Sequence, residues 1–262
     1  MLSPESTIGE FLLATVTNMA NREKEILPRL DDPSDRDAIH DFRVEIRKLR
    51  SVLGSCSPLV EKEWLSNFRS QLKAMDEIIS PVRDAHVLLD RFKSYPEKIV
   101  SSNYALCVRL ETMSSEAEAT FTNNLHSQQF TAFFAIIDLA DGGSIPIPKA
   151  DELIYKYLKE FNKEQWKSLT RKIRNSKQHQ FHQIRIKSKK VRYLAEASIP
   201  ILGNRLEKHA VLANQIQVLL GELQDSTMMT QIASSPYLLE IERREVDRIQ
   251  ITWEQLARKV LM

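Results

Sequence analysis

Glycine is scarce in this chain: only 6 of its 262 residues are glycine, far below the usual share of about 7%. Glycine supplies the positive φ angles that tight turns, bulges and phosphate-binding loops need. A β protein with many turns is therefore not expected. The sequence also contains no GxGxxG and no GxxxxGK pattern, so the dinucleotide-binding and P-loop folds lack their fingerprints.

Cysteine and long hydrophobic runs are scarce as well. The two cysteines, Cys56 and Cys107, fit neither a zinc motif nor a disulfide framework, and two isolated thiols indicate a reducing compartment. The longest purely apolar run, around residues 133–137, is far shorter than the roughly 20 residues that span a bilayer. The first ten residues have no basic stretch followed by an apolar one, so no signal peptide is expected. These absences predict a cytoplasmic protein with no membrane segment.

Neither sign of charge dominates the chain. There are 37 lysines and arginines against 35 aspartates and glutamates, which gives a formal net charge of +2. Net charge alone therefore does not indicate a partner that is a polyanion. Whether a polyanion is a partner therefore has to be judged from how the charges are arranged along the chain.

Apolar residues recur at the spacing of helices in many parts of the chain. One example has members at i, i+4, i+7 and i+11, which lie on one helix face: Phe42, Ile46, Leu49 and Leu53. No segment alternates convincingly between polar and apolar residues, and most prolines fall near the ends of the periodic runs, where helices begin or end. Pro81 lies inside such a run and is expected to kink it or mark a short break. The sequence predicts an all-α protein.

A basic motif occurs twice. The first copy is His40-x-x-Arg43-x-x-x-Arg47-Lys48-Leu49-Arg50, and 142 residues later the second is His182-x-x-Arg185-x-x-x-Lys189-Lys190-Val191-Arg192. At a spacing of 141, Val82-Arg83-Asp84 matches Leu223-Gln224-Asp225, so one loop residue accounts for the drift. Both matched segments occur in the same order in the two halves of the chain. This predicts two helical bundles related by an internal pseudo-two-fold repeat, at residues 1–140 and 141–262.

The two predicted repeats are joined and ended differently. Residues 141–148 combine two glycines and two prolines and are expected to form a linker. The first repeat continues through residues 97–140 where the second has only residues 237–262. An extra helix is therefore expected in the first repeat.

The basic residues of each copy form one stripe along their helix. With 100° per residue, the stripe members fall within roughly 80° of one another: His40, Arg43, Arg47 and Arg50 in the first copy, and His182, Arg185, Lys189 and Arg192 in the second. Apolar residues border both sides: Val44 lies opposite the core positions of the first copy, and Ile186 and Tyr193 lie opposite Ile184 and Val191 in the second. This pattern favours cations that line a cleft over a plain solvated face.

Cations crowded on one stripe repel one another and need a counter-charge. The carboxylates that repeat, Asp84 and Asp225, are expected to give structural support by pairing with some of them. They are too few, so an anionic ligand is the better explanation. Arginine forks, lysine ammonium groups and histidine donors suit phosphate oxygens.

The second repeat is the more basic. Residues 163–192 hold eleven lysines and arginines against one acid, Glu164. Two facing stripes would form one long basic cleft, which suits an extended polyanion better than a mononucleotide.

This duplicated motif, followed by Arg83-Asp84-x-His86-Val87-Leu88 or by Leu220-Gly221-Glu222-Leu223-Gln224-Asp225, resembles the CHAD family of conserved histidine α-helical domains. The resemblance covers essentially the whole chain. It implies two pseudo-symmetric helical bundles, a basic central pocket and binding of inorganic polyphosphate. By position, it implies phosphate contacts for both motif copies: His40, Arg43, Arg47, Lys48 and Arg50, and His182, Arg185, Lys189, Lys190 and Arg192. Ser80 stands where the second half has Gly221, which puts the local turn in doubt.

Other interpretations stay open. The stripes could be ordinary solvated helix faces. The His40-Asp41 and Asp84-x-His86 pairs are also typical of metal-dependent phosphohydrolases acting on polyphosphate or nucleotides, although cations crowd the place where a metal would lie. Nucleic acid is the third possible partner, but the tryptophans do not interleave with the basic runs as base stacking would require. We expect a non-catalytic protein that uses no metal and no cofactor.

Overall fold

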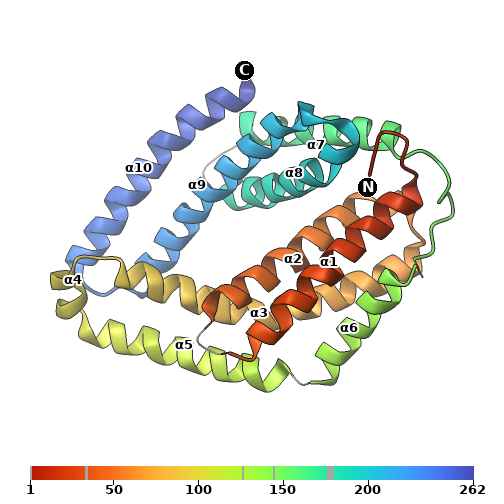
Figure 1. Ribbon diagram of the computed structural model, residues 1–262. Helices are drawn as coiled ribbons and strands as arrows, with labels where there is room; N and C mark the ends of the chain where they lie inside the picture. Colours follow the sequence, from red (N-terminus) through yellow and green to blue (C-terminus); the bar gives the residue numbers. More distant parts are fainter. Residues whose placement is uncertain (1, 33–34, 126, 144, 176–179) are drawn as a thin grey trace. The chain divides into compact units, whose positions relative to one another are not determined.

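The computed structural model describes the chain except residues 1, 33–34, 126, 144 and 176–179, and except the side chains of residues 136, 139 and 141. The described part is all-α, as predicted, and contains no strand; an isolated bridge joins Thr7 to Leu153. The helices are α1 (Ile8–Leu30), α2 (Arg36–Ser55), η1 (Ser57–Leu59), α3 (Lys62–Lys93), α4 (Glu97–Ser102), α5 (Tyr104–Leu125), α6 (Gln128–Asp141), α7 (Tyr155–Arg174), α8 (Phe181–Leu202), η3 (Asn204–Leu206), α9 (Glu207–Ile232) and α10 (Pro236–Leu261) (Figure 1).

Local sequence signals set several helix ends. Thr7 and Glu10 form a reciprocal capping box at the start of α1, which satisfies two backbone donors that the first turn leaves open. The Asp35 side chain accepts a hydrogen bond from the backbone of Ala38 at 2.9 Å and so caps α2. Pro81, where a kink or a short break is expected, causes no break: it lies inside α3, which continues to Lys93.

The end of the first predicted repeat contains more helix than the end of the second. Among the described residues, α4, α5 and α6 follow residue 96, whereas α10 alone follows Ser235. Additional helix is thus present where an extra helix is expected, although there is more of it than one helix. The linker predicted at residues 141–148 begins at the last residue of α6 and has no helix from Gly142 onward; Ser144 within it lies outside the described residues.

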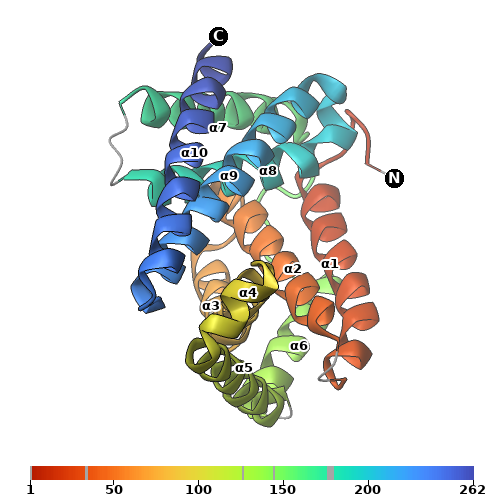
Figure 2. The same ribbon diagram turned by 90° about the vertical axis from the view of Figure 1, so that its left-hand side faces the viewer.

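Contacts divide the chain into two compact units. Unit 1 consists of Met1–Arg83, Glu116–Asn162 and Tyr193–Glu207. Its core combines the apolar faces of α1, α2, α3 and α6, and includes the fully buried Phe11, Phe42, Phe68 and Phe133. Within this unit α1 and α2 lie side by side in both views (Figures 1 and 2).

Unit 2 consists of Asp84–Ser115, Lys163–Arg192 and Lys208–Met262. It has two apolar clusters: one joins α7, α8, α9 and α10 around Ile216 and Ile249, and the other joins α3, α5, α9 and α10 around Phe92 and Met229. Both units draw segments from both sides of residue 140. The division by contacts thus differs from the division by repeat, and the repeat at 1–140 and 141–262 stays a prediction.

Candidate functional site

The first basic stripe lies on α2, next to the core face of that helix. The predicted core positions Phe42, Ile46 and Leu53 are fully buried, and Leu49 is nearly so. Because this face anchors α2 in unit 1, the helix holds its basic face in a fixed direction. The position of the stripe therefore follows from the amphipathic pattern of the sequence.

Three arginines of this stripe converge on one carboxylate of α3, that of Asp76. Arg47 Nε lies 3.3 Å from Oδ1, Arg50 Nη1 lies 3.1 Å from Oδ2, and Arg43 Nε lies 3.8 Å from Oδ1. Ser80, one turn further along α3, accepts a hydrogen bond from Arg43 at 3.1 Å and donates one to Asp76 at 3.3 Å. The structure thus brings together three of the predicted phosphate ligands around an acid.

Asp76 is charged beside the arginines of this group. Burial alone would raise the pKa of Asp76, but Arg47, Arg50 and Arg43 lower it on balance, so Asp76 is ionised at neutral pH. The Asp76 carboxylate contacts three guanidinium groups, which remain charged at any physiological pH. Asp76 therefore holds the arginines together, and by itself its one negative charge cannot balance all three.

His40 and Lys48 occupy other positions on α2. Desolvation and the nearby Arg83 lower the pKa of His40, although Asp41 and Asp37 act in the opposite direction. His40 is thus neutral at pH 7, and an anion beside it would raise its pKa. Lys48 Nζ contacts Glu45 on its own helix at 2.7 Å, so it lies apart from the group around Asp76.

The second basic stripe lies on the first half of α8, in unit 2. Its arginines contact amides on α9: Arg185 Nη1 donates to Gln224 Oε1 at 2.8 Å, and Arg192 Nη1 donates to Asn214 Oδ1 at 2.7 Å. His182 is exposed, and Lys189 and Lys190 are half-buried. An amide oxygen accepts a hydrogen bond but brings no negative charge, in contrast to Asp76 beside the first stripe.

The apolar borders of the stripes differ from the expectation. Ile184, Val191 and Tyr193 are buried, but Ile186 is 56% exposed and Val44 is half-buried. Each stripe therefore has one buried apolar border, and its other border is partly open to solvent.

Corresponding arginines of the two motif copies meet corresponding positions of α3 and α9. Arg43 reaches Ser80, and a Cβ built on Gly221 would lie 3.4 Å from Arg185 Nη2. The turn expected at these positions does not exist, because both lie inside long helices. At both positions an arginine of the basic stripe passes close to the neighbouring helix.

Sequence reasoning missed Asp76, although a signal for it exists. Asp76, Ser80 and Asp84 follow one another at four-residue steps, so they share one face of α3. The equivalent of Asp76 at the spacing of 141 is Gln217, so a search for acids that repeat passes over it.

The predicted supporting acids, Asp84 and Asp225, are half-buried on α3 and α9. Burial lowers the pKa of Arg91, but Glu242, Asp225 and Glu245 raise it on balance. Asp225 therefore acts on a cation of α3 in unit 2 that is not part of either stripe. Support of the stripes by Asp84 and Asp225 stays a prediction.

The described residues give no indication of a metal centre or of a membrane span. They contain no group of three or more histidine, cysteine, aspartate or glutamate side chains placed to hold a metal ion. None of the helices in the described part is long and apolar enough to cross a membrane.

The described part of the chain defines an all-α protein that carries one basic motif on α2 and another on α8. A family model of the CHAD domain matches residues 12–234, and the chain belongs to this family. A comparison with curated protein sequences gave no match.

Two solved structures have similar folds. PptA from Streptomyces chartreusis is 16% identical, with a TM-score of 0.74, over 97% of this chain and 100% of its own. The CHAD domain from the plant Ricinus communis is also 16% identical, with a TM-score of 0.74, over 99% of this chain and 93% of its own. At this identity the likeness concerns the fold.

Proposed function

We propose that this protein binds inorganic polyphosphate, or a similar extended polyanion, through the two basic stripes and without catalysis. The observation that carries the proposal is the convergence of Arg43, Arg47 and Arg50 on the single carboxylate of Asp76. Guanidinium forks held in one place are suited to several phosphate oxygens at once. Membership of the CHAD family supports the same ligand class.

The second stripe supports an extended ligand. It carries further cations on α8, Arg185, Lys189, Lys190 and Arg192, and residues 163–192 as a whole contain a single acid. A chain of phosphates presents charge at regular intervals, so it can satisfy many cations that one phosphate cannot. Participation of both stripes in one site is part of the proposal and is tested below.

The test is a competition experiment at fixed salt. Long polyphosphate, short polyphosphate, RNA and DNA are each titrated against one fluorescent anion bound to the protein. We expect long polyphosphate to displace the probe at the lowest concentration. We also expect its affinity to fall steeply between low and physiological salt, because the protein's cations displace the counterions condensed on the polyanion. Equal competition by RNA and DNA, or an affinity that does not change with salt, would contradict the proposal.

Two variants show whether the stripe is responsible. Arg47→Gln removes one contact to Asp76 and should weaken polyphosphate binding, whereas Arg22→Gln, which changes an exposed arginine paired with Glu25 on α1, should not. Incubation with polyphosphate and divalent metal ions, followed by measurement of released phosphate, tests the alternative of a phosphohydrolase. We expect the length of the polyphosphate to stay unchanged.

A further inference from the structure

Helices α9 and α10 form a hairpin in unit 2 with a groove between them. Only residues 233–235 separate the two helices, and α10 returns along α9 in the opposite direction (Figures 1 and 2). The groove has a volume of about 510 Å³. It is lined by Asn214, Gln215, Val218, Leu219 and Glu222 of α9 and by Arg248, Thr252, Gln255, Leu256 and Lys259 of α10.

Apolar side chains line the middle of this groove. Leu219 is 7% exposed and Leu256 is half-buried, and both contribute to the apolar cluster that joins α7, α8, α9 and α10. Val218 is 52% exposed, so a large part of this apolar side chain is in contact with water. Covering it by another molecule would remove that surface from water, which is favourable.

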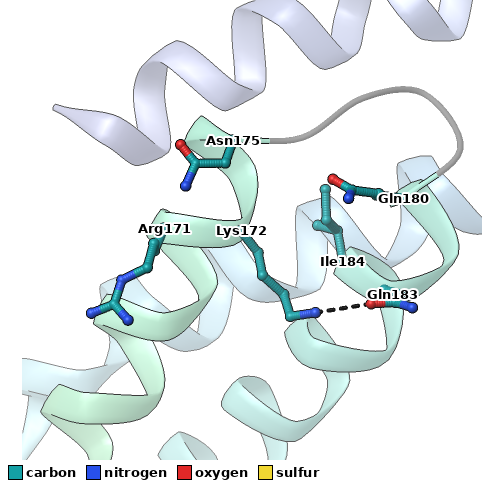
Figure 3. Close-up of a pocket in the computed structure, with 6 residues that line it drawn as sticks. All are labelled: Arg171, Lys172, Asn175, Gln180, Gln183 and Ile184. Atoms are coloured by element: carbon teal, nitrogen blue, oxygen red, sulfur yellow. Dashed lines mark hydrogen bonds between the residues drawn. The ribbon is translucent and has the colours of Figure 1, made fainter.

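The cavity between α7 and α8 in the same unit is of a different kind (Figure 3). It has a volume of about 200 Å³, and apart from Ile184 its lining is polar or charged. Lys172 of α7 reaches across and donates to Gln183 of α8 at 3.0 Å. The groove between α9 and α10 is larger and partly apolar, so it is the better candidate for contact with another molecule.

Both walls of the groove have the residue spacing of a surface against which helices pack. Steps of three and four residues alternate along each helix, which keeps the members on one face and suits further helices packed at a small angle. A second pair of helices laid along the groove would complete an arrangement of four. The members are Gln215, Val218 and Glu222 on α9 and Arg248, Thr252, Gln255 and Lys259 on α10.

An ion pair crosses one end of the groove. Arg248 Nη2 lies 2.9 Å from Glu222 Oε2, and the two side chains are 53% and 40% exposed, although Arg248 also contacts Glu245. A two-fold axis along the groove would exchange its two sides and keep the position along it, so α10 of a second copy would lie opposite α9. Each Glu222 would then face Arg248 of the other copy, and four charges would alternate in sign around the axis.

We propose that the α9–α10 hairpin of a second copy of this chain packs into the groove, with the two-fold axis parallel to the helices. The four helices then alternate in direction, as in an antiparallel bundle. Val218 of each copy is covered by α10 of the other. Lys259, at the far end of the groove from Glu222, faces the amides of Asn214 and Gln215 of the other copy, so no two lysines lie opposite each other.

The experiment is sedimentation velocity of the whole protein from about 1 to about 200 µM, a range that covers micromolar dissociation constants. We expect the wild type to shift from one chain to two. Val218→Asp should raise the dissociation constant at least about tenfold, because the symmetry buries the new carboxylate twice. The matched control is Ile251→Asp, which changes a 63% exposed residue of α10 outside the groove and should leave the dimer intact. Melting temperatures check that both variants are folded.

Charge variants test the arrangement of the two copies. Glu222→Arg and Arg248→Glu should each weaken the dimer, since like charges then face each other across the axis. Mixing the two single variants should restore association, because a copy with two arginines then faces a copy with two glutamates. Contacts within one chain cannot produce this recovery. A protein that stays monomeric, a dimer that Val218→Asp leaves intact, or a mixture without recovery would overturn the proposal; a monomer would leave the groove to a different partner.

Discussion

Asp76 is the residue that sets the balance between stability and binding in the first stripe. Its carboxylate attracts Arg43, Arg47 and Arg50, and it would repel a phosphate bound by the same arginines. The three guanidinium groups repel one another when this carboxylate is neutralised. Asp76 therefore stabilises the free protein and opposes the ligand.

The first prediction concerns Asp76→Asn. We expect the variant to lose about 1–3 kcal/mol of unfolding free energy, because charged hydrogen bonds are removed, and to bind polyphosphate more tightly than the wild type at the same salt concentration. Thermal denaturation with and without polyphosphate measures both effects. Glu77→Gln, which changes the exposed neighbour paired with Lys73, is the matched control and should alter neither. Binding that Asp76→Asn leaves unchanged or weakens would contradict repulsion between Asp76 and a bound phosphate.

Glu23 is the clearest source of pH dependence in the fold. It is 1% exposed on α1, and neither carboxyl oxygen has a hydrogen-bond partner among the described residues. Burial, with Glu45 and Asp138 nearby, raises the pKa of Glu23 to about 8. The folded protein therefore keeps this proton at neutral pH.

The second prediction follows from that proton. Between the model-peptide value of 4.5 and about 8, the unfolded chain has released the proton and the folded protein has not, so stability falls as the pH rises. The slope from this residue is at most about 1.4 kcal/mol per pH unit. Glu23→Gln should match the wild type near pH 4 and be more stable at pH 8, as urea denaturation at a series of pH values would show. Glu25→Gln, an exposed change on the same helix, should retain the wild-type slope.

At the scale of helices, Gly221 and Gly54 show how arginines cross a neighbouring helix. A Cβ on Gly221 would make an ordinary contact of 3.4 Å with the Arg185 guanidinium group, whereas one on Gly54 would come within 2.9 Å of Arg69 Nη2. Arg69 also donates a hydrogen bond to the carbonyl of Gly54 at 3.3 Å. Only at Gly54 does the neighbouring arginine lie too close for a Cβ atom.

The third prediction compares these two glycines. Gly221→Ala should stabilise the protein by about 0.5–1 kcal/mol, the cost of glycine inside a helix relative to alanine. Gly54→Ala should gain less or lose stability, because Arg69 has to move and give up its hydrogen bond. Melting temperatures of both variants decide the order, and a larger gain for Gly54→Ala would contradict the close approach of Arg69.

A buried ion pair connects α10 to α3 in unit 2. Arg91 Nη2 lies 2.6 Å from Glu242 Oε2, and the Glu242 side chain has no exposed surface. The same guanidinium group donates to Ser226 of α9. One arginine therefore joins three helices.

The fourth prediction is that Glu242→Gln costs about 3–5 kcal/mol, because it leaves a charge largely buried and without its partner. Glu240 lies on the exposed side of the same helix and pairs with Arg244. The control Glu240→Gln should therefore cost less than about 1 kcal/mol. Chemical denaturation gives both values, and amide hydrogen exchange in α10 shows whether this helix opens first. Equal costs for the two variants would contradict the role of Arg91.

For the whole molecule, the question is whether both halves of the sequence contribute to one polyphosphate site. The fifth prediction is that Arg43→Gln with Arg47→Gln weakens binding about as much as Arg185→Gln with Lys189→Gln. Each lost phosphate contact should cost roughly 1–3 kcal/mol. Titration of long polyphosphate measures this, and Arg22→Gln with Lys73→Gln is the control for the loss of two positive charges. A loss confined to one pair would replace the shared site by a single stripe.

The sequence alone determined the all-α class, the family and the buried face of α2, since Phe42, Ile46 and Leu53 repeat with the period of the helix. It also placed the cations of each copy on one stripe, because their angular spacing depends only on helix geometry. These properties are local, so they can be determined from neighbouring residues. The sequence marked Pro81 as a kink or a short break; α3 is continuous there, although proline inside a helix costs roughly 3 kcal/mol, so the helix depends on its packing at this point.

Tertiary structure decided which side chains meet. Arg47 and Asp76 are 29 residues apart, and no periodicity links them, so their contact depends on how α2 packs against α3 in unit 1. The same holds for Lys187 of α8, which donates to Gln165 of α7 at 2.6 Å. It also holds for Glu23, which the sequence alone does not distinguish from a surface acid but which the fold buries. Packing takes water away from these groups and sets their neighbours, and both effects determine the charge that each one carries.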